Sequence, residues 1–227
     1  MRYKGILMDA DDTLFDFQAG NRRAVYQLCD EIGYTHPDRY EQYEEINLAC
    51  WAALERGEMT QAQLQTLRWQ RFFDRYGIDA DGKWAGERGA ALLGMQAIML
   101  PHAEETARAI AEKLPILILT NGITSVQKSR LALSPLSDIV TDMVISQEVG
   151  CAKPGPEIFD IALRKLGIAR NEALMIGDGI SSDVLGANNA GVDVCWYNPH
   201  HKTLPVGVHT EYEIDDIRDC AAIALSD

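Results

Sequence analysis

Short, continuously apolar runs recur along the chain, and several of them end directly before a polar or acidic residue. Such runs are typical of strands buried on both faces of a parallel sheet. They occur at residues 5–8, 116–119, 142–146, 174–176 and 192–196, of which 142–146 is the weakest. Apolar residues at helical spacing mark the segments between and beside them, at 103–113, 124–133, 156–166 and 182–190. This alternation predicts a doubly wound, Rossmann-like α/β fold on a parallel sheet.

The stretch from about residue 16 to residue 98 lacks strand-like runs and shows helical patterns instead. Thr60 and Gln63 have the spacing of a capping box at the start of one of these helices, which Gly77 ends. We therefore expect a catalytic core of residues 1–15 and 98–227 and an inserted α-helical domain of residues 16–97. Five aromatic residues of the insertion are expected to be core residues, although one or two of them remain candidates for stacking on a base. These are Tyr40, Tyr43, Trp51, Trp69 and Trp84.

Composition narrows the class of partner. The chain has 227 residues, of which 47% are hydrophobic and 24% charged, as in soluble globular proteins. Its 21 Lys and Arg residues against 34 Asp and Glu give a formal net charge of −13. This charge repels polyanions, so nucleic acid polymers and anionic membranes are poor partners. A small anionic substrate remains compatible, because a metal ion or a local basic group offsets the field.

The apolar runs and the cysteines of the sequence bear on the cellular location of the protein. No stretch approaches the ~18 apolar residues of a membrane span, and the apolar run before Asp9 is too short for a signal peptide. The five cysteines are widely spaced and form no CxxC pair, which fits a reducing cytoplasm. We expect a cytoplasmic protein that is a monomer or a homodimer.

Candidate chemistry gathers where the predicted strands end. In open parallel sheets, ligands bind beyond the carboxyl ends of the strands. Asp9 and Asp11 follow the first strand, two positions apart, and in an extended segment they would face one site. The second strand ends in Thr120-Asn121-Gly122 just before a helix, where a hydroxyl group and backbone amides suit an anion.

Two further strand-end positions complete the set. Lys153 lies in a loop immediately before a helix, and Asp178 follows a strand, with Asp183 five residues later. The carboxylates of Asp9, Asp11, Asp178 and Asp183 predict an oxygen-only metal site, and hard cations such as Mg²⁺ prefer oxygen ligands. Each motif alone has an ordinary explanation as a turn, a helix cap or a surface loop. Their joint order at successive strand ends favours catalysis at phosphorus.

Taken in order, the motifs resemble those of the haloacid dehalogenase-like (HAD) hydrolase superfamily, over nearly the whole chain. The motif residues are Asp9-Ala10-Asp11-Asp12-Thr13-Leu14, then Thr120, Lys153, and Gly177-Asp178 with Asp183. The helical insertion resembles the C1-type cap of that superfamily. Within it, residues 9–17, 146–153 and 196–201 are similar to bacterial pyrimidine 5'-nucleotidases.

The resemblance implies a role for each residue. Asp9 would be the nucleophile that forms an aspartyl-phosphate, and Asp11 the general acid that later acts as base. Thr120 and Lys153 would stabilise the phosphoryl group. The strand-end pattern itself assigns the amides of Asn121 and Gly122 to the remaining phosphate oxygens. Mg²⁺ would be held by Asp9, the backbone carbonyl of Asp11, and Asp178. Asp183 would support the metal or orient its loop.

We therefore expect a Mg²⁺-dependent phosphomonoesterase for nucleoside 5'-monophosphates, with pyrimidine nucleotides favoured. A sugar phosphate or another small phosphometabolite is the alternative substrate. A haloacid dehalogenase is less favoured, because the acid Asp11 has a role only when an alkoxide leaves. A non-catalytic binding module on the same fold is the remaining alternative.

Overall fold

The computed structural model describes residues 1–226, and the chain divides into two compact units. The core unit comprises Met1–Phe17 together with the chain from Ala97 onward, and the helical unit comprises Gln18–Gln96. Among the described residues no helix has both the length and the apolar character needed to span a membrane. The five cysteines are free thiols, and four of them are buried.

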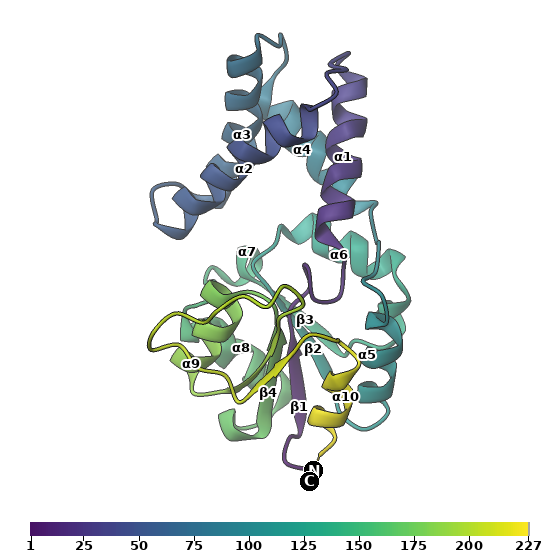
Figure 1. Ribbon diagram of the computed structural model, residues 1–227, viewed down its shortest axis with the longest axis vertical. Helices are drawn as coiled ribbons and strands as arrows, with labels where there is room; N and C mark the ends of the chain where they lie inside the picture. The colour runs from purple at the N-terminus through teal and green to yellow at the C-terminus, as the bar shows by residue number, and fades with distance from the viewer. Residues whose placement is uncertain (227) are drawn as a thin grey trace. The chain divides into compact units, whose positions relative to one another are not determined.

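A six-stranded sheet forms the centre of the core unit, with the strand order β3-β2-β1-β4-β5-β6 (Figure 1). Its strands are β1 (Gly5–Met8), β2 (Ile116–Thr120), β3 (Asp142–Ile145), β4 (Ala173–Gly177), β5 (Asp193–Tyr197) and β6 (Tyr212–Ile214). All neighbouring strands pair in parallel. Met8 of β1 lies opposite Ile118 of β2 and Ile176 of β4, so the carboxyl ends of these three strands share one edge. The predicted parallel α/β sheet is confirmed.

Helices cover both faces of this sheet, which explains why its central strands are apolar throughout. In β1, Ile6 and Met8 contribute to one buried cluster and Leu7 to the other, because successive side chains of a strand point to opposite faces. α5 (Ala103–Ala111), the 3₁₀ turn η1 (Pro135–Asp138) and α10 (Asp219–Ala224) supply residues to the first cluster. α8 (Pro156–Leu166) and α9 (Leu185–Ala190) supply the second cluster, on the other side of the sheet (Figure 1). The remaining elements of this unit are α6 (Thr124–Leu133), α7 (Ser146–Val149) and η2 (Arg170–Glu172).

The helix expected over residues 182–190 is altered at its start. A π-helical turn, η3 (Ile180–Val184), precedes α9. The amides of Asp183 and Val184 both donate to the carbonyl oxygen of Gly179, and the Asp183 carboxylate accepts from the Gly179 amide at 2.9 Å. The bond from the Val184 amide spans five residues and makes the turn wide, and the return bond holds the Asp183 side chain against the Gly179 amide. Wide turns of this kind are frequent at functional sites.

Helices make up the second unit, as the sequence predicts. They are α1 (Phe17–Glu31), α2 (Arg39–Glu55), α3 (Gln61–Tyr76) and α4 (Gly82–Gly94). The predicted capping box is present, because Thr60 accepts from the Gln63 amide and the Gln63 side chain accepts from the Thr60 amide. Gly77 ends α3 with a φ of 64°, a left-handed conformation that favours glycine.

The five aromatic residues expected in the core of the helical unit differ in burial, and Trp51 is half-buried. Tyr40, Tyr43 and Trp69 are buried as expected, and the rings of Tyr43 and Trp69 lie 4.2 Å apart between centroids. The expectation is wrong for Trp84, which is 44% exposed. A Cβ atom on Gly82 would lie 2.7 Å from Gln70 of α3, so the face of α4 that carries Gly82 packs against α3. Trp84 lies about 200° around the helix from Gly82 and is therefore on another face.

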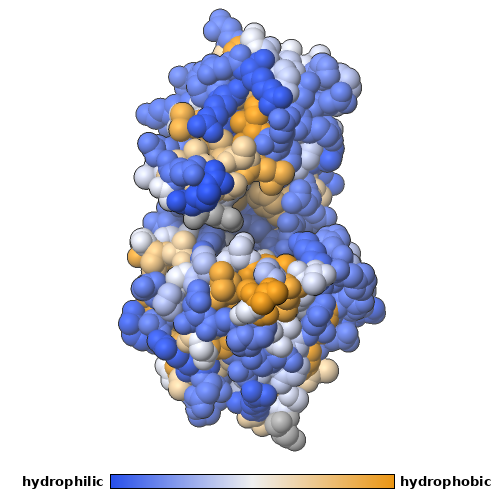
Figure 2. Space-filling view, turned by 60° about the vertical axis from the view of Figure 1, so that its left-hand side comes forward, coloured by the Kyte–Doolittle hydropathy of each residue, from blue (hydrophilic) through white to orange (hydrophobic). Residues whose placement is uncertain are grey.

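The surface is mostly polar, with exposed apolar residues at a few positions (Figure 2). The face drawn in Figure 2 is mostly hydrophilic, with apolar patches among polar residues. The large apolar side chains that are exposed are scattered over several elements: Met1, Leu48, Trp84, Met95, Leu133 and Val206. Isolated residues of this kind are normal on a folded protein.

Candidate active site

Polar residues follow three neighbouring strands at the carboxyl edge of the sheet. Asp9 follows β1, Thr120 ends β2, and Asp178 follows β4. The Asp9 amide donates to the carbonyl oxygen of Ile176 at 2.9 Å, which continues the pairing of β1 with β4 past the end of the strand. The sheet thereby sets these side chains in one region, as the strand-end pattern predicts.

The buried ammonium group of Lys153 bridges two of the carboxylates. Its Nζ atom lies 2.5 Å from Asp9 Oδ1 and 2.6 Å from Asp183 Oδ1, and it donates to the carbonyl oxygen of Leu119 at 2.7 Å. An ammonium group has three protons, and these three acceptors can take all of them. Lys153 is 4% exposed, Asp9 8% and Asp183 0%.

Asn121 holds the loop that delivers Lys153. Its side-chain amide donates to the Lys153 carbonyl oxygen at 2.8 Å, and its Oδ1 atom accepts from the Lys153 amide at 2.9 Å. The sequence singled out Asn121 for its backbone amide, and this use of its side chain was not foreseen. The buried Thr120 hydroxyl accepts from the Gly122 amide at 3.1 Å, which closes the turn after β2.

A second acidic residue is positioned by its surroundings. The Asp178 carboxylate lies 3.5 Å from the Thr13 hydroxyl. The backbone carbonyl of Asp178 accepts from the indole of Trp196 at 3.0 Å. One carboxylate oxygen each from Asp9, Asp178 and Asp183 lies within 4.8 Å of the others. This acidic cluster, defined by these three residues, contains oxygen donors only.

The electrostatics of the acidic cluster favour a further positive charge. Burial raises the pKa of Asp9 well above its usual range, and the charge of Asp183 adds to the effect. Burial, with Asp183 and Asp12, raises the pKa of Asp178 to about 7. Burial lowers the pKa of Lys153, but the charges of Asp183 and Asp9 outweigh it and raise the pKa overall. Three carboxylates meet one ammonium group here, so the ionised cluster carries excess negative charge.

These residues fit a hard divalent cation. Carboxylates, backbone carbonyls and water are the usual ligands of Mg²⁺, and thiols are not. The excess charge of the acidic cluster is of the sign that a cation neutralises. A buried Asp cluster that can hold a metal ion is therefore present at the predicted edge.

The Asp11 carboxylate lies outside the acidic cluster. Its Oδ2 atom accepts from Gln127 Nε2 at 2.7 Å, and its Oδ1 atom forms an ion pair with Arg130. The sequence led us to expect Asp9 and Asp11 on one side of an extended segment, and the backbone explains the difference. The chain turns after β1, because the amides of Leu14 and Phe15 both donate to Ala10 and Asp12 adopts a φ of 58°.

Sequence reasoning missed Gln127 and Arg130. Both lie on α6, three residues apart and therefore on one face of the helix. Gln127 is 1% exposed and Arg130 0%. The available signal was two large polar residues on the face of the helix that also carries Val126, which is weak without knowledge of the partner.

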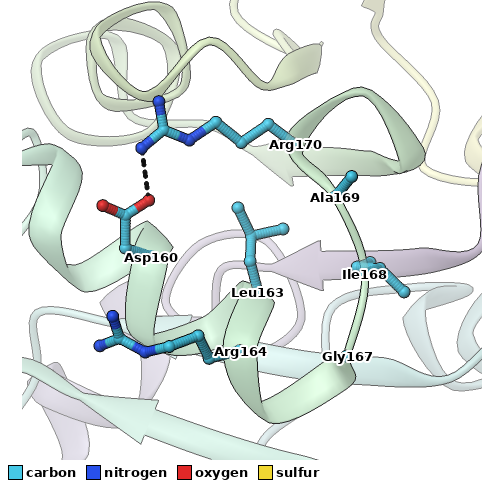
Figure 3. Close-up of a pocket in the computed structure, with 7 residues that line it drawn as sticks. All are labelled: Asp160, Leu163, Arg164, Gly167, Ile168, Ala169 and Arg170. Atoms are coloured by element: carbon cyan, nitrogen blue, oxygen red, sulfur yellow. Dashed lines mark hydrogen bonds and ion pairs between the residues drawn. The ribbon is translucent and has the colours of Figure 1, made fainter.

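A separate surface groove lies at the other end of α8. It is lined by Leu163, Arg164 and residues 167–170, and Arg170 donates to Asp160 at 2.7 Å (Figure 3). α8 starts just after Lys153 and the groove surrounds its last turn. The groove therefore lies toward the amino ends of the strands, away from the candidate site.

Several known proteins are similar to this chain in sequence and in fold. Pyrimidine 5'-nucleotidase PynA of Streptococcus pneumoniae is 34% identical over 226 residues, covering 97% of this chain and 95% of that protein. Pyrimidine 5'-nucleotidase YjjG of Escherichia coli is 33% identical over 223 residues, covering 96% of each. The magnesium-bound crystal structure of the putative HAD-hydrolase YfnB of Bacillus subtilis matches with a TM-score of 0.93 and 29% identity, covering 100% of both chains. Residues 3–191 match the family model of the haloacid dehalogenase-like hydrolases, and the chain belongs to that family.

Proposed function

We propose that this protein is a Mg²⁺-dependent phosphomonoesterase that hydrolyses nucleoside 5'-monophosphates, with pyrimidine nucleotides preferred. The observation that carries the reaction is Asp9, a buried carboxylate held between Lys153 and the other carboxylates of the acidic cluster. The similarity to PynA and YjjG, over nearly the whole chain, supports the choice of substrate. Nucleoside monophosphates are intracellular metabolites, which agrees with a cytoplasmic location.

The reaction proceeds in two displacements at phosphorus. A carboxylate oxygen of Asp9 attacks phosphorus, the bond from phosphorus to the ester oxygen breaks, and that oxygen takes a proton from Asp11. Water then attacks the aspartyl-phosphate and gives its proton to Asp11. The bond from phosphorus to the Asp9 oxygen breaks, which releases inorganic phosphate and regenerates the Asp9 carboxylate.

The remaining residues hold the phosphoryl group in place. Lys153 supplies positive charge beside Asp9, and the Thr120 hydroxyl and the Asn121 amide would donate to phosphoryl oxygens, while the Gly122 amide donates to the Thr120 oxygen and holds that hydroxyl in place. Asp9, Asp178 and the backbone carbonyl of Asp11 would hold Mg²⁺, and Asp183 orients Lys153 and the Gly179 loop. When bound, Mg²⁺ offsets the repulsion between the carboxylates and the phosphate.

The leaving group must be chosen elsewhere, because the residues named so far concern phosphate and metal alone. We assign this selection to the helical unit, acting as a cap domain, and to the loops of the core unit. Tyr43 and Trp69 are buried in the interior of the helical unit, so they stabilise it and are not the surface that contacts a base. A sugar phosphate remains the competing substrate class.

Phosphate release tests the proposal. We expect kcat/KM for UMP, dUMP or dTMP to exceed the values for glucose 6-phosphate, fructose 1-phosphate and phosphoglycolate. Activity should vanish in excess EDTA and return with Mg²⁺, and the Asp9→Asn variant should be inactive in both conditions. A sugar phosphate preferred by about tenfold, or ~1.4 kcal/mol in transition-state binding, would overturn the nucleotide assignment. Undiminished turnover in metal-free enzyme would overturn the metal assignment.

A further inference from the structure

The carboxylate of Asp11 is held by both of its oxygens from one helix. Gln127 Nε2 donates to Oδ2 at 2.7 Å, and the guanidinium of Arg130 pairs with Oδ1. The two donors are neighbours on α6, while Asp11 lies 116 and 119 residues before them in the chain. Two donors on one carboxylate fix both its position and the plane of the group.

Arg130 is a buried charge with a single anionic partner among the described residues. It is 0% exposed, and its Nε and second terminal nitrogen have no hydrogen-bond partner there. The guanidinium carbon lies 4.4 Å from the ring centroid of the buried Phe15, which packs against its face. A buried guanidinium without its carboxylate is strongly unfavourable, so this arrangement depends on Asp11.

The side chain of Gln127 packs closely against Gly122 in the turn that follows β2. A Cβ atom on Gly122 would lie 2.2 Å from Gln127 Nε2, so the absence of a side chain at Gly122 gives Gln127 room to reach Asp11. The other side-chain atom, Oε1, is buried without a partner among the described residues. Gln127 therefore connects the Thr120 turn with the Asp11 carboxylate.

The two contacts differ in how readily they can be exchanged. The bond from Arg130 joins a fully buried guanidinium cation to the carboxylate, whereas the bond from Gln127 comes from a neutral amide and is the weaker of the two. Asp11 Oδ2 can thus leave Gln127 for the oxygen of a leaving group while Oδ1 remains on Arg130. The carbonyl oxygen of a protonated carboxyl group still accepts a hydrogen bond, so Arg130 can hold Oδ1 through both displacements.

We propose that Arg130 and Gln127 are positioning residues for Asp11, with Arg130 as the fixed anchor and Gln127 as the partner that Oδ2 exchanges for the leaving group. This inference rests on the proposed function, because it assumes that Asp11 is the acid and base. Neither residue touches phosphate or metal in this scheme. Their loss should therefore act through Asp11 and should resemble the loss of Asp11 itself.

Two aryl phosphates separate this role from a structural one. Phenyl phosphate has a poor leaving group that needs an acid, whereas p-nitrophenyl phosphate needs little help. For Arg130→Met we expect kcat/KM on phenyl phosphate to fall about tenfold or more, with a several-fold smaller loss on p-nitrophenyl phosphate, because kcat/KM reports the first displacement and the second is the same for both esters. Gln127→Met should show the same pattern more weakly, and Arg130→Lys should restore part of the loss.

The double variant gives the sharpest test. If Arg130 acts through Asp11, adding Arg130→Met to Asp11→Asn should lower phenyl phosphate turnover no further than Asp11→Asn alone. Equal losses on both esters, or a further loss in the double variant, would overturn the proposal. Thermal melts check folding, and failure of both Arg130→Met and Gln127→Met to fold would also overturn it in favour of a structural pair. Wild-type enzyme that hydrolyses neither ester would instead overturn the proposed function.

Discussion

The Nζ atom of Lys153 lies 2.5 Å from Oδ1 of Asp9, although 144 positions separate the two residues in the chain. Lys153 comes from the loop before α8 and Asp9 from the end of β1, so the contact joins two distant segments at the carboxyl edge of the sheet. It gives the ionised nucleophile a compensating charge within a buried environment. Removing Lys153 leaves Asp9 and Asp183 as buried carboxylates without their shared ammonium group, which is more costly than the pairs are favourable.

Replacing this lysine should impair both stability and catalysis. Lys153→Met removes the single ammonium group that bridges Asp9 and Asp183, and we expect the metal-free protein to lose about 3–5 kcal/mol of unfolding free energy. Mg²⁺ should recover part of this loss, because it neutralises the same carboxylates. The kcat value should fall about 10²–10³-fold even in Mg²⁺. Urea denaturation with EDTA and with Mg²⁺, alongside steady-state kinetics, measures these effects.

An exposed lysine provides the matched control. Lys128 pairs with Glu148 on the surface, and such pairs contribute at most about 1 kcal/mol. Lys128→Met should therefore change neither kcat nor the response to Mg²⁺. If Lys153→Met behaved like Lys128→Met, the account of the buried bridge would be wrong.

The raised pKa of Asp178 makes a signed prediction for the metal-free protein. Burial, with the charges of Asp183 and Asp12, raises this pKa from 3.8 to about 7 in the folded state. The folded protein thus binds the proton more tightly than the unfolded chain, and this stabilisation is lost as the pH rises through about 7. In EDTA, the difference between the Tm of the wild type and the Tm of Asp178→Asn should decrease as the pH is raised from about 5 to about 8.

Two controls accompany the pH series. Excess Mg²⁺ should reduce the wild-type penalty at the higher pH, because the cation competes with the proton for the same oxygens. Asp216 is ionised across this interval, since hydrogen bonds from Arg218 lower its pKa to about 2, so Asp216→Asn should show no such trend. If the Tm difference between wild type and Asp178→Asn did not change with pH, the raised pKa of the buried Asp178 carboxyl would be contradicted.

Close packing of α3 on α4 predicts the effect of one glycine in the helical unit. A Cβ atom on Gly86 would lie 2.4 Å from the carbonyl oxygen of Gln65. Alanine normally stabilises a helix interior by about 1 kcal/mol relative to glycine, but here we expect a loss of about 1–3 kcal/mol. Gly20→Ala is the control, because its Cβ atom would come no nearer than 3.3 Å to a side chain. An increase in Tm for Gly86→Ala would contradict the close contact.

The sequence predicts the scaffold well, for a physical reason. A strand buried on both faces has to be apolar at every position, so β1, β2 and β4 are visible as runs. The helices are marked by periodicity and by local stop signals such as Gly77 and Gly167. These patterns are local, and the structure confirms the elements they predict to within a few residues.

The contacts within the candidate site are less predictable, because they join distant segments. Nothing near Asp11 indicates that Arg130 is its partner, since 119 residues separate them and the turn after β1 directs Asp11 toward α6. At the π-helical turn η3 the Gly179 amide bonds to the Asp183 side chain, and helix periodicity does not encode that contact. The catalytic roles given to these residues stay predictions until they are measured.

The central claim is that Asp9 carries the phosphoryl group, and trapping that group on the enzyme tests it most directly. Asp11→Asn with p-nitrophenyl phosphate and Mg²⁺ should complete the first displacement, because the leaving group needs little acid, and should stall before the second, because the base is missing. We predict a burst of p-nitrophenolate equal to the enzyme concentration, followed by borohydride reduction of an acyl phosphate that peptide mapping locates at Asp9. Steady phosphate release without a burst, or a phosphoryl group on a residue other than Asp9, would contradict the account.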